Sequence, residues 1–383
     1  MIYIYPLFRY APCEFPKFID FVSLLFYYVI NDIKKSLFRV LADYSRIFPG
    51  KNLMTLLTDR YRRPIDYLRV SITDRCNLRC LYCMPLGGTV KLNHEDILSY
   101  EEFLRLIQIA VNMGINKVRL TGGEPLVRKG VVDFCRRLTR ISGLQSLSLT
   151  TNGVLLEELG QDLHAAGIRR VNVSLDTLQR EKFFRITRRD EFDRVWRSIQ
   201  AAERVGFDPV KINVVVMRGI NDDEVLDLAR LSLHHPYHIR FIEFMSINDD
   251  SQWTSQHYFS ADEILAKLNK VGSLEPVTAQ HTNGPARHFH WPGAAGMIGI
   301  ISPISHHFCP SCNRIRLTAD GKLRNCLFSD QEVDIKSPLR QGATDSELSQ
   351  LLKDSIANKP EKHSLQPDVF RKCQSRPMVA IGG

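Results

Sequence analysis

From residue 66 onward, apolar runs rich in β-branched residues alternate with stretches whose apolar positions recur at helical spacing. Tyr100–Met113 and Phe192–Val205 are the clearest predicted helices, because each is followed by a glycine. Alternating strands and helices imply parallel strands joined by right-handed crossovers, so we expect an α/β fold with ligands at the C-terminal ends of the strands. The predicted strands are Tyr67–Thr73, Lys117–Thr121, Leu144–Thr150, Arg170–Leu175, Val210–Val216 and His238–Phe244.

The rhythm changes after about residue 250. A last short helix is predicted over Ala261–Lys270, followed by short strands containing Gly, Pro and His up to Leu327. Residues 341–375 are polar and capable of forming a helix. We therefore divide the chain into an N-terminal extension (1–53), a barrel (54–250), a C-terminal region (251–340) and a final helix and tail (341–383).

The extension contains an apolar and aromatic run, Phe18–Ile30, which is interrupted by Asp20. A membrane-spanning helix needs about 20 apolar residues, and this run is shorter. Asp20, Asp32 and Asp43 also argue against a transit peptide, which avoids acidic residues. We expect either a peripheral extension or an upstream translation preceding Met54, and a cytoplasmic protein.

Composition restricts the class of protein. Of the 383 residues, 44% are hydrophobic and 24% are charged, which is normal for a folded globular chain. The net charge of +9 fits an anionic partner, which could be a nucleotide, a nucleic acid or an acidic lipid, as well as a basic surface. Six of the nine cysteines fall in two tight groups, which indicates metal ligands more than a disulfide framework. Cys13, Cys135 and Cys373 lie outside these groups, and Cys135 is expected to pack in a helix.

The first cysteine group follows the first predicted strand with the spacing C-x3-C-x2-C, at Cys76, Cys80 and Cys83. A closed zinc site needs four ligands, and the next histidine, His94, is eleven residues away. Three thiolates on a 4Fe-4S cluster would leave one iron open to the amino and carboxylate groups of S-adenosylmethionine. The spacing by itself also occurs in zinc sites.

The flanking sequence, SITDRCNLRCLYCMP, resembles the GTP 3′,8-cyclase family of molybdenum cofactor biosynthesis, within the radical S-adenosylmethionine superfamily. The resemblance covers about residues 54–383. It implies an incomplete (β/α)6 barrel of six parallel strands, of the TIM type, with the C-terminal region closing the open side. It also implies radical cyclisation of GTP, in which a 5′-deoxyadenosyl radical takes the ribose 3′ hydrogen and the carbon radical attacks C8 of guanine.

The second cysteine group has the spacing C-x2-C-x13-C, at Cys309, Cys312 and Cys326. His306 and His307 lie just before it, so a Cys3His zinc site is one reading of the spacing. The stretch FCPSCNRIRLTADGKLRNCL is similar to the second cluster motif of the cyclase family. That resemblance implies a second 4Fe-4S cluster whose open iron faces the guanine ring.

Several strand ends carry chemistry. Thr121-Gly-Gly-Glu-Pro125 follows the second strand, and its glycines allow close approach to a ligand while Glu124 offers an acceptor to an ammonium. Arg314 and Arg316 alternate along a predicted strand, which puts both guanidinia on one face. The resemblance assigns S-adenosylmethionine to Tyr82, Gly123, Ser174 and Met245. It assigns GTP to Arg69, Arg119, Thr150, Lys211, Arg314, Ile315 and Arg316, and catalytic roles to Arg314, Arg316, Gly382 and Gly383.

The loop Ser246–Asp250 departs from the usual family sequence. The resemblance further implies an external electron donor, a downstream cyclic pyranopterin monophosphate synthase and, as one option, a homodimer; neither nucleic acid nor membrane is an expected partner. Two alternatives stay open. One is another radical enzyme with an auxiliary cluster, acting on peptide or RNA, and the other is a zinc-stabilised nucleic-acid-binding protein.

Overall fold

A computed structural model describes residues 57–245, 255–277, 284–363 and 376–382. The N-terminal extension with Cys13 and Met54, the loop 246–250, Cys373 and Gly383 lie outside these ranges. Residues 57–383 form one compact unit, to which everything below refers.

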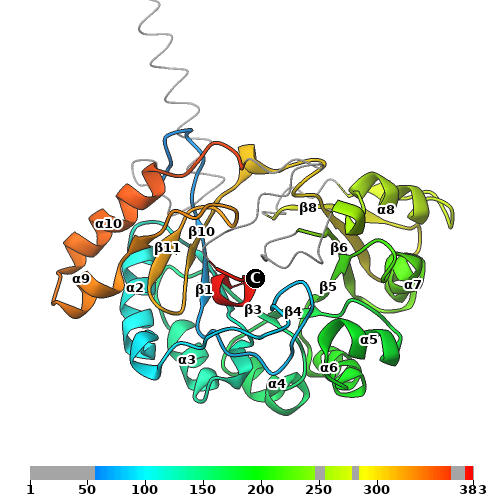
Figure 1. The fold of residues 1–383 in the computed structure, drawn as a ribbon, viewed down its shortest axis with the longest axis horizontal. Helices are drawn as coiled ribbons and strands as arrows, with labels where there is room; N and C mark the ends of the chain where they lie inside the picture. The colour runs from blue at the N-terminus through cyan, green and yellow to red at the C-terminus, as the bar shows by residue number, and fades with distance from the viewer. Residues whose placement is uncertain (1–56, 246–254, 278–283, 364–375, 383) are drawn as a thin grey trace, which may run out of the picture. The chain divides into compact units, whose positions relative to one another are not determined.

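Twelve strands form one sheet in the order β12-β11-β10-β1-β2-β3-β4-β5-β6-β9-β8-β7 (Figure 1). The first six along the chain run parallel to their neighbours in the sheet, and they confirm the six predicted strands to within two residues. They are β1 (Tyr67–Ser71), β2 (Lys117–Thr121), β3 (Ser146–Thr151), β4 (Arg170–Ser174), β5 (Val210–Val216) and β6 (His238–Glu243).

The C-terminal strands extend this sheet at both edges. At one edge, β10 (Arg314–Leu317) runs parallel to β1, and β11 (Lys322–Arg324) and β12 (Val333–Asp334) follow it antiparallel. At the other edge, β9 (Met297–Ile301) runs parallel to β6, followed by β8 (Ala286–His290) and β7 (Glu275–Pro276). Among the described strands no pairing joins β12 to β7, so the barrel is incomplete, as predicted.

The helices lie on the outer side of the curved sheet, apart from α11, which lies within its curve (Figure 1). Local sequence sets several of their starts. Ser99 accepts a hydrogen bond from the Glu102 backbone N–H, and the Glu102 carboxylate accepts one from Ser99, which closes a capping box worth about 1 kcal/mol. The helices are α2 (Tyr100–Asn112), α3 (Val131–Leu138), α4 (Leu156–Ala165), α5 (Arg180–Thr187), α6 (Phe192–Val205), α7 (Val225–His234), α8 (Ala261–Leu268), α9 (Lys336–Arg340), α10 (Asp345–Ala357) and α11 (Met378–Ile381). Short 3-10 turns cover η2 (His94–Asp96), η3 (Pro125–Val127), η4 (Asp222–Glu224), η5 (Ser255–His257) and η6 (Cys309–Ser311).

Alternation along the strands separates an apolar layer from a polar one. On β1, Leu68 and Val70 are fully buried in the core that the sheet forms with the helices. Tyr67 and Arg69, on the opposite face, line a cavity inside the curve. Cys135 is fully buried under α3, which confirms its predicted packing role. None of the described helices is both long and apolar enough to cross a membrane.

Candidate active site

A cavity of about 610 Å³ lies inside the curve of the sheet. Both cysteine groups line it, together with alternate residues from β1 to β6 and from β10. Cys76 follows the C-terminal end of β1, whereas Cys312 precedes β10, which runs parallel to β1. The two groups therefore lie at opposite ends of a pair of strands, of which the five-residue β1 is about 17 Å long.

The first cysteine group forms a loop that packs against the end of α5. The backbone N–H groups of Arg79 and Leu81 donate to Thr187 and Ile186, each at 2.9 Å. Its three thiols are free. Burial raises the pKa of the Cys80 thiol, and the neighbouring Cys83 and Cys76 thiols raise it further, so the three sulfurs face a common space. A metal cluster would stabilise the thiolates that burial disfavours, so the donor set fits one.

Glu124 does not act as the free acceptor that was expected of it. Its carboxylate is 1% exposed and accepts hydrogen bonds from Thr151 Oγ1 at 2.7 Å, the Asn152 backbone N–H at 2.6 Å and the Leu126 backbone N–H at 3.0 Å. Burial raises its pKa to about 7. The side chain instead positions Asn152, whose Nδ2 lies 3.7 Å from Cys76 Sγ as a donor.

The four residues assigned to S-adenosylmethionine all line the cavity near the first cysteine group. Gly123 and Ser174 lie at the ends of β2 and β4, and Met245 follows β6. A Cβ on Gly123 would stand 2.3 Å from the Arg75 carbonyl oxygen, so only glycine fits there. Tyr82 donates its hydroxyl to the buried carboxylate of Asp176. The structure thus brings this predicted set together.

The predicted cations also converge in the cavity. Strand register places Arg69 beside Arg316 of β10 on one side and beside Arg119 of β2 on the other. Lys211 lies next to Asn172, which in turn donates to Thr150 Oγ1 at 3.2 Å. Alternation therefore collects positive charge from several strands on one face of the sheet.

The cations disturb one another's ionisation. Burial lowers the pKa of Lys211 to about 7, with Arg240 and Arg119 adding to the effect. Burial, followed by the charge of Arg314, lowers the pKa of Arg316 to about 10. Like charges held together out of water need an anion to stabilise them, so this part of the cavity is built for an anionic ligand.

Sequence reasoning missed further polar residues of the cavity. Arg240 of β6 is 9% exposed, and its Nε has no hydrogen-bond partner among the described residues. It lies opposite Asn213 in the register. An arginine between the apolar Ile239 and Phe241 is the same signal that identified Arg119, so the sequence could have revealed it. The other cationic or imidazole side chains that line the cavity unpredicted are Lys117, Arg170, His238, His288 and His363.

The second cysteine group is held by two buried cations. Lys359 donates from Nζ to the Arg314 carbonyl oxygen at 2.9 Å, and Arg63 donates from Nη1 to the Cys309 carbonyl oxygen at 2.8 Å. Burial opposes ionisation of Cys312, but the charges of Lys359 and Arg314 outweigh it and lower the pKa of this thiol to about 7. The site therefore favours a thiolate, the form that binds metal.

One of the two histidines just before the second cysteine group has a carboxylate partner. His306 lies 2.9 Å from Asp262 at the start of α8. No three His, Cys, Asp or Glu side chains in the described part of the chain are placed to hold a single metal ion.

The C-terminal tail reaches the cavity. Ile381 is 1% exposed and packs with Met245, Leu327 and Phe328, and Gly382 accepts a hydrogen bond from Arg316 Nη1 at 2.7 Å. Gly382 has a φ of 82°. Gly383 lies outside the described residues. Ile315 is 2% exposed on the opposite face of β10 and does not line the cavity, so only its main chain could touch a ligand there.

Comparison with known proteins agrees with this arrangement. The family model of the radical SAM superfamily matches residues 70–232, and that of Molybdenum Cofactor Synthesis C matches residues 237–365. The GTP 3′,8-cyclase of Moorella thermoacetica is 50% identical over 327 residues, which are 85% of this chain and 100% of the relative. The GTP 3′,8-cyclase of Thermodesulfovibrio yellowstonii is 51% identical over 329 residues, again 85% and 100%.

Solved structures resemble the chain in fold. Streptococcus suis SuiB matches with a TM-score of 0.52 and 16% identity, covering 77% of this chain and 66% of its own. SuiB bound to its precursor peptide SuiA matches with a TM-score of 0.55 and 16% identity, covering 84% and 72%. At this identity the likeness concerns the fold alone, and it does not carry a peptide substrate over to this chain.

Proposed function

The chain belongs to the GTP 3′,8-cyclase family of radical S-adenosylmethionine enzymes, and from that premise we propose which of its residues carry out the reaction. The enzyme converts GTP to (8S)-3′,8-cyclo-7,8-dihydroguanosine 5′-triphosphate, the first step of molybdenum cofactor biosynthesis. One observation carries the proposal. A single cavity has a cysteine group at each end, and cationic side chains of the strands line it between the two groups.

Cys76, Cys80 and Cys83 hold the radical-generating 4Fe-4S cluster, and Cys309, Cys312 and Cys326 hold a second one. With S-adenosylmethionine bound, the first cluster, reduced by the external donor, would supply the electron that cleaves the sulfonium to methionine and a 5′-deoxyadenosyl radical. Tyr82, Gly123, Ser174 and Met245 bind the S-adenosylmethionine. Their place beside the first cysteine group and the steric demand at Gly123 support this assignment.

The triphosphate lies against the cations on the inner face of the sheet. Arg69, Arg119 and Lys211 come from three strands, and Arg240 completes the set from a fourth. Guanidinium groups suit phosphate oxygens because each presents two parallel donors. The proposal extends to Thr150, which is separated from Lys211 by Asn172 on the strand between them.

The guanine ring lies toward the second cysteine group. Arg314 and Arg316 of β10 stand between that group and the other cations, and Arg314 stacks over the Phe308 ring at 4.9 Å. Both can stabilise negative charge on the substrate while the walls exclude water. Gly382 and Gly383 act at the same place, which the hydrogen bond from Arg316 to Gly382 supports.

Each segment of the chain has its own part in the proposed reaction. Residues 54–250 form the barrel that binds S-adenosylmethionine, residues 251–340 add the second cluster, and residues 341–383 supply the final helix and the tail. The extension 1–53 is dispensable for catalysis. An external electron donor, a downstream cyclic pyranopterin monophosphate synthase and a homodimeric state complete the proposal. A cytoplasmic location suits free thiols in metal-binding groups.

Anaerobic turnover with GTP, S-adenosylmethionine and a reductant tests the function. We expect the 3′,8-cyclised nucleotide and 5′-deoxyadenosine in equal amounts, and about eight iron atoms per chain from two 4Fe-4S clusters. Zinc in place of iron after anaerobic purification, or cofactor cleavage without any change in GTP, would refute the proposal.

A further inference from the structure

Arg376 is the first described residue of the C-terminal tail. Its guanidinium lies against the carboxylates of Asp320 and Glu332. Nη2 donates to Asp320 Oδ2 at 2.7 Å and Nη1 donates to Asp320 Oδ1 at 2.9 Å, in a two-pronged pair. Nε lies 3.0 Å from Glu332 Oε1. The three side chains are only 19%, 11% and 15% exposed. A bidentate pair shielded from water is stronger and more directional than an exposed one.

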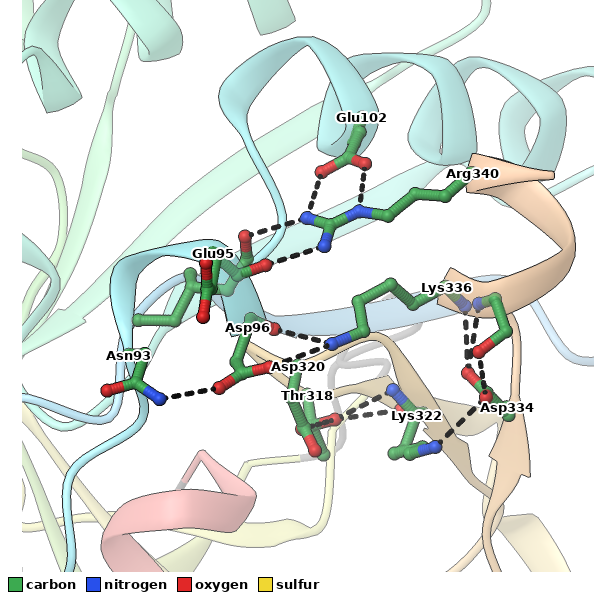
Figure 2. A network of polar contacts seen from close by, with 12 residues as sticks. Asn93, Glu95, Asp96, Glu102, Thr318, Asp320, Lys322, Asp334, Lys336 and Arg340 are labelled. Carbon is green, nitrogen blue, oxygen red and sulfur yellow. Dashed lines mark hydrogen bonds and ion pairs between the residues drawn. The ribbon is translucent and has the colours of Figure 1, made fainter. Parts of the chain in front are cut away.

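Asp320 is itself fixed. It lies in the turn between β10 and β11, and its Oδ1 accepts a hydrogen bond from Thr318 Oγ1 at 2.7 Å. Gly321 beside it has a φ of 73°, and a Cβ there would stand 2.6 Å from the Lys336 Cβ. Figure 2 shows the turn within a polar network that reaches η2, where Lys336 Nζ donates to the Asp96 carbonyl oxygen at 3.0 Å. The carboxylate that receives Arg376 therefore belongs to a turn of the C-terminal region that hydrogen bonds and close packing hold in place.

Glu332 has a second cationic partner. Arg324 of β11, which is fully buried, pairs with the same carboxylate oxygen and also donates to the Ser329 carbonyl oxygen. Glu332 therefore stays paired when Arg376 is replaced. A substitution at Arg376 therefore removes the tail's contact and leaves Glu332 paired with Arg324, while Asp320 keeps the hydrogen bond from Thr318 Oγ1.

The β10–β11 hairpin forms hydrogen bonds with both ends of the described tail. Asp320 in its turn holds Arg376, while Arg316 on β10 donates to the carbonyl oxygen of Gly382. Between these points Val379 and Ile381 are each 1% exposed. A Cβ on Gly382 would lie 2.7 Å from Thr121 Oγ1, so the tail end fits closely against β2. The position of Arg376 therefore determines the position of Gly382 beside Arg316.

We propose that Arg376 is a positioning residue, whose ion pairs with Asp320 and Glu332 keep the C-terminal tail docked so that Gly382 reaches Arg316. The inference rests on the proposed function in one respect, namely that the docked tail assists GTP cyclisation. Arg376, Asp320 and Glu332 do not line the cavity, so their effect on turnover passes through the tail and not through contact with the substrate.

Hydrogen exchange followed by mass spectrometry on the full, cluster-loaded chain tests the docking directly. In Arg376→Ala we expect the peptide 376–383 to exchange at least tenfold faster. The increase should be smaller in Arg376→Lys, which keeps the positive charge but cannot donate to both oxygens of Asp320 in the same two-pronged geometry. Arg137→Ala breaks an exposed pair with Glu101 and serves as the matched control with no change. Asp320→Asn should release the tail as Arg376→Ala does.

Turnover is measured on the same samples. The kcat for the cyclised nucleotide should fall at least tenfold in Arg376→Ala, with iron content, S-adenosylmethionine binding and exchange of residues 314–324 at parent values. Unchanged tail exchange in both Arg376→Ala and Asp320→Asn would overturn the docking role. Faster tail exchange with parent-level turnover would overturn the link to catalysis. If the parent made no cyclised product, the proposed function would fail, while the exchange comparison would still decide whether Arg376 holds the tail.

Discussion

Tyr82, the residue before the last cysteine of the first group, donates its hydroxyl to Oδ2 of Asp176 at 2.7 Å. The other oxygen of Asp176 accepts the Val215 backbone N–H at 2.8 Å, so one carboxylate joins the cysteine loop to β5. Burial raises the pKa of Asp176 to about 6. The pair therefore connects the loop that carries the thiols to the framework of the sheet.

Replacing Asp176 should loosen this connection. Asp176→Ala leaves the Tyr82 hydroxyl and the Val215 N–H without their partner, and should lower the free energy of unfolding by about 1–3 kcal/mol. Asp176→Asn keeps an acceptor and should lose less than half as much. Anaerobic chemical denaturation measures both variants. Equal stability of Asp176→Ala and the parent would show that water replaces the carboxylate.

The two cysteine groups should be separable by mutation, because they lie at opposite ends of β1 and β10. Cys309→Ser should keep cleavage of S-adenosylmethionine and lose cyclisation, whereas Cys80→Ser should lose both. Each variant should retain about four iron atoms per chain. Iron analysis and quantification of 5′-deoxyadenosine decide the matter, and loss of all iron from either variant would contradict independent sites.

The cations should act on the triphosphate. Arg240→Ala removes a charged donor from the cavity, which should weaken GTP by about 1.5–3 kcal/mol, or roughly 10- to 150-fold. Guanosine binding should change much less, and Arg137→Ala serves again as the control. Calorimetric titration with both ligands measures the difference. A parent that binds guanosine as tightly as GTP would contradict the assignment.

Lys211 should make GTP binding depend on pH. Its pKa of about 7 lies below that of an unfolded lysine, at roughly 10.4, so between these values the unfolded chain binds more protons. The stability of the ligand-free protein should therefore rise with pH across this window. A nearby phosphate favours the charged form, so binding at pH 8 should take up close to one proton and the affinity should fall as pH rises.

Titration calorimetry in two buffers of different ionisation enthalpy measures this uptake. Lys211→Met should bind GTP more weakly and without the proton. If the parent takes up none, Lys211 is either charged before GTP arrives or not beside the phosphates.

The strands β2 and β5 were predicted to the residue, because β-branched runs bounded by helices carry a local signal. The pairing of β10 with β1 could not be read in this way, since Tyr67 and Arg314 are adjacent in the sheet and remote in the sequence. The two C-terminal extensions of the sheet depend on such distant contacts.

The site was predicted to a similar extent. The six cysteines that we propose as cluster ligands were visible as spacing, and Arg119 as a charge in an apolar strand. The role predicted for Glu124 was wrong. The direction of its side chain is set by Thr151 and Asn152 at the end of β3, and the sequence alone does not show that these residues lie beside it. The partners of Arg376 were likewise invisible, since the turn that holds it is set by the fold.

The parallel pairing of β10 with β1 makes the cavity sensitive to insertions more than to substitutions. Arg316 faces inward and Ile315 outward because side chains alternate along a strand whose register is fixed against Arg69 and Leu68. One added residue before Arg314 that shifted β10 by one position would turn both arginines into the apolar layer and bring Ile315 into the cavity. A single insertion there would remove two positive charges from the cavity, displace the guanidinium that donates to the Gly382 carbonyl oxygen and shift the second cysteine group, although every original side chain would still be present.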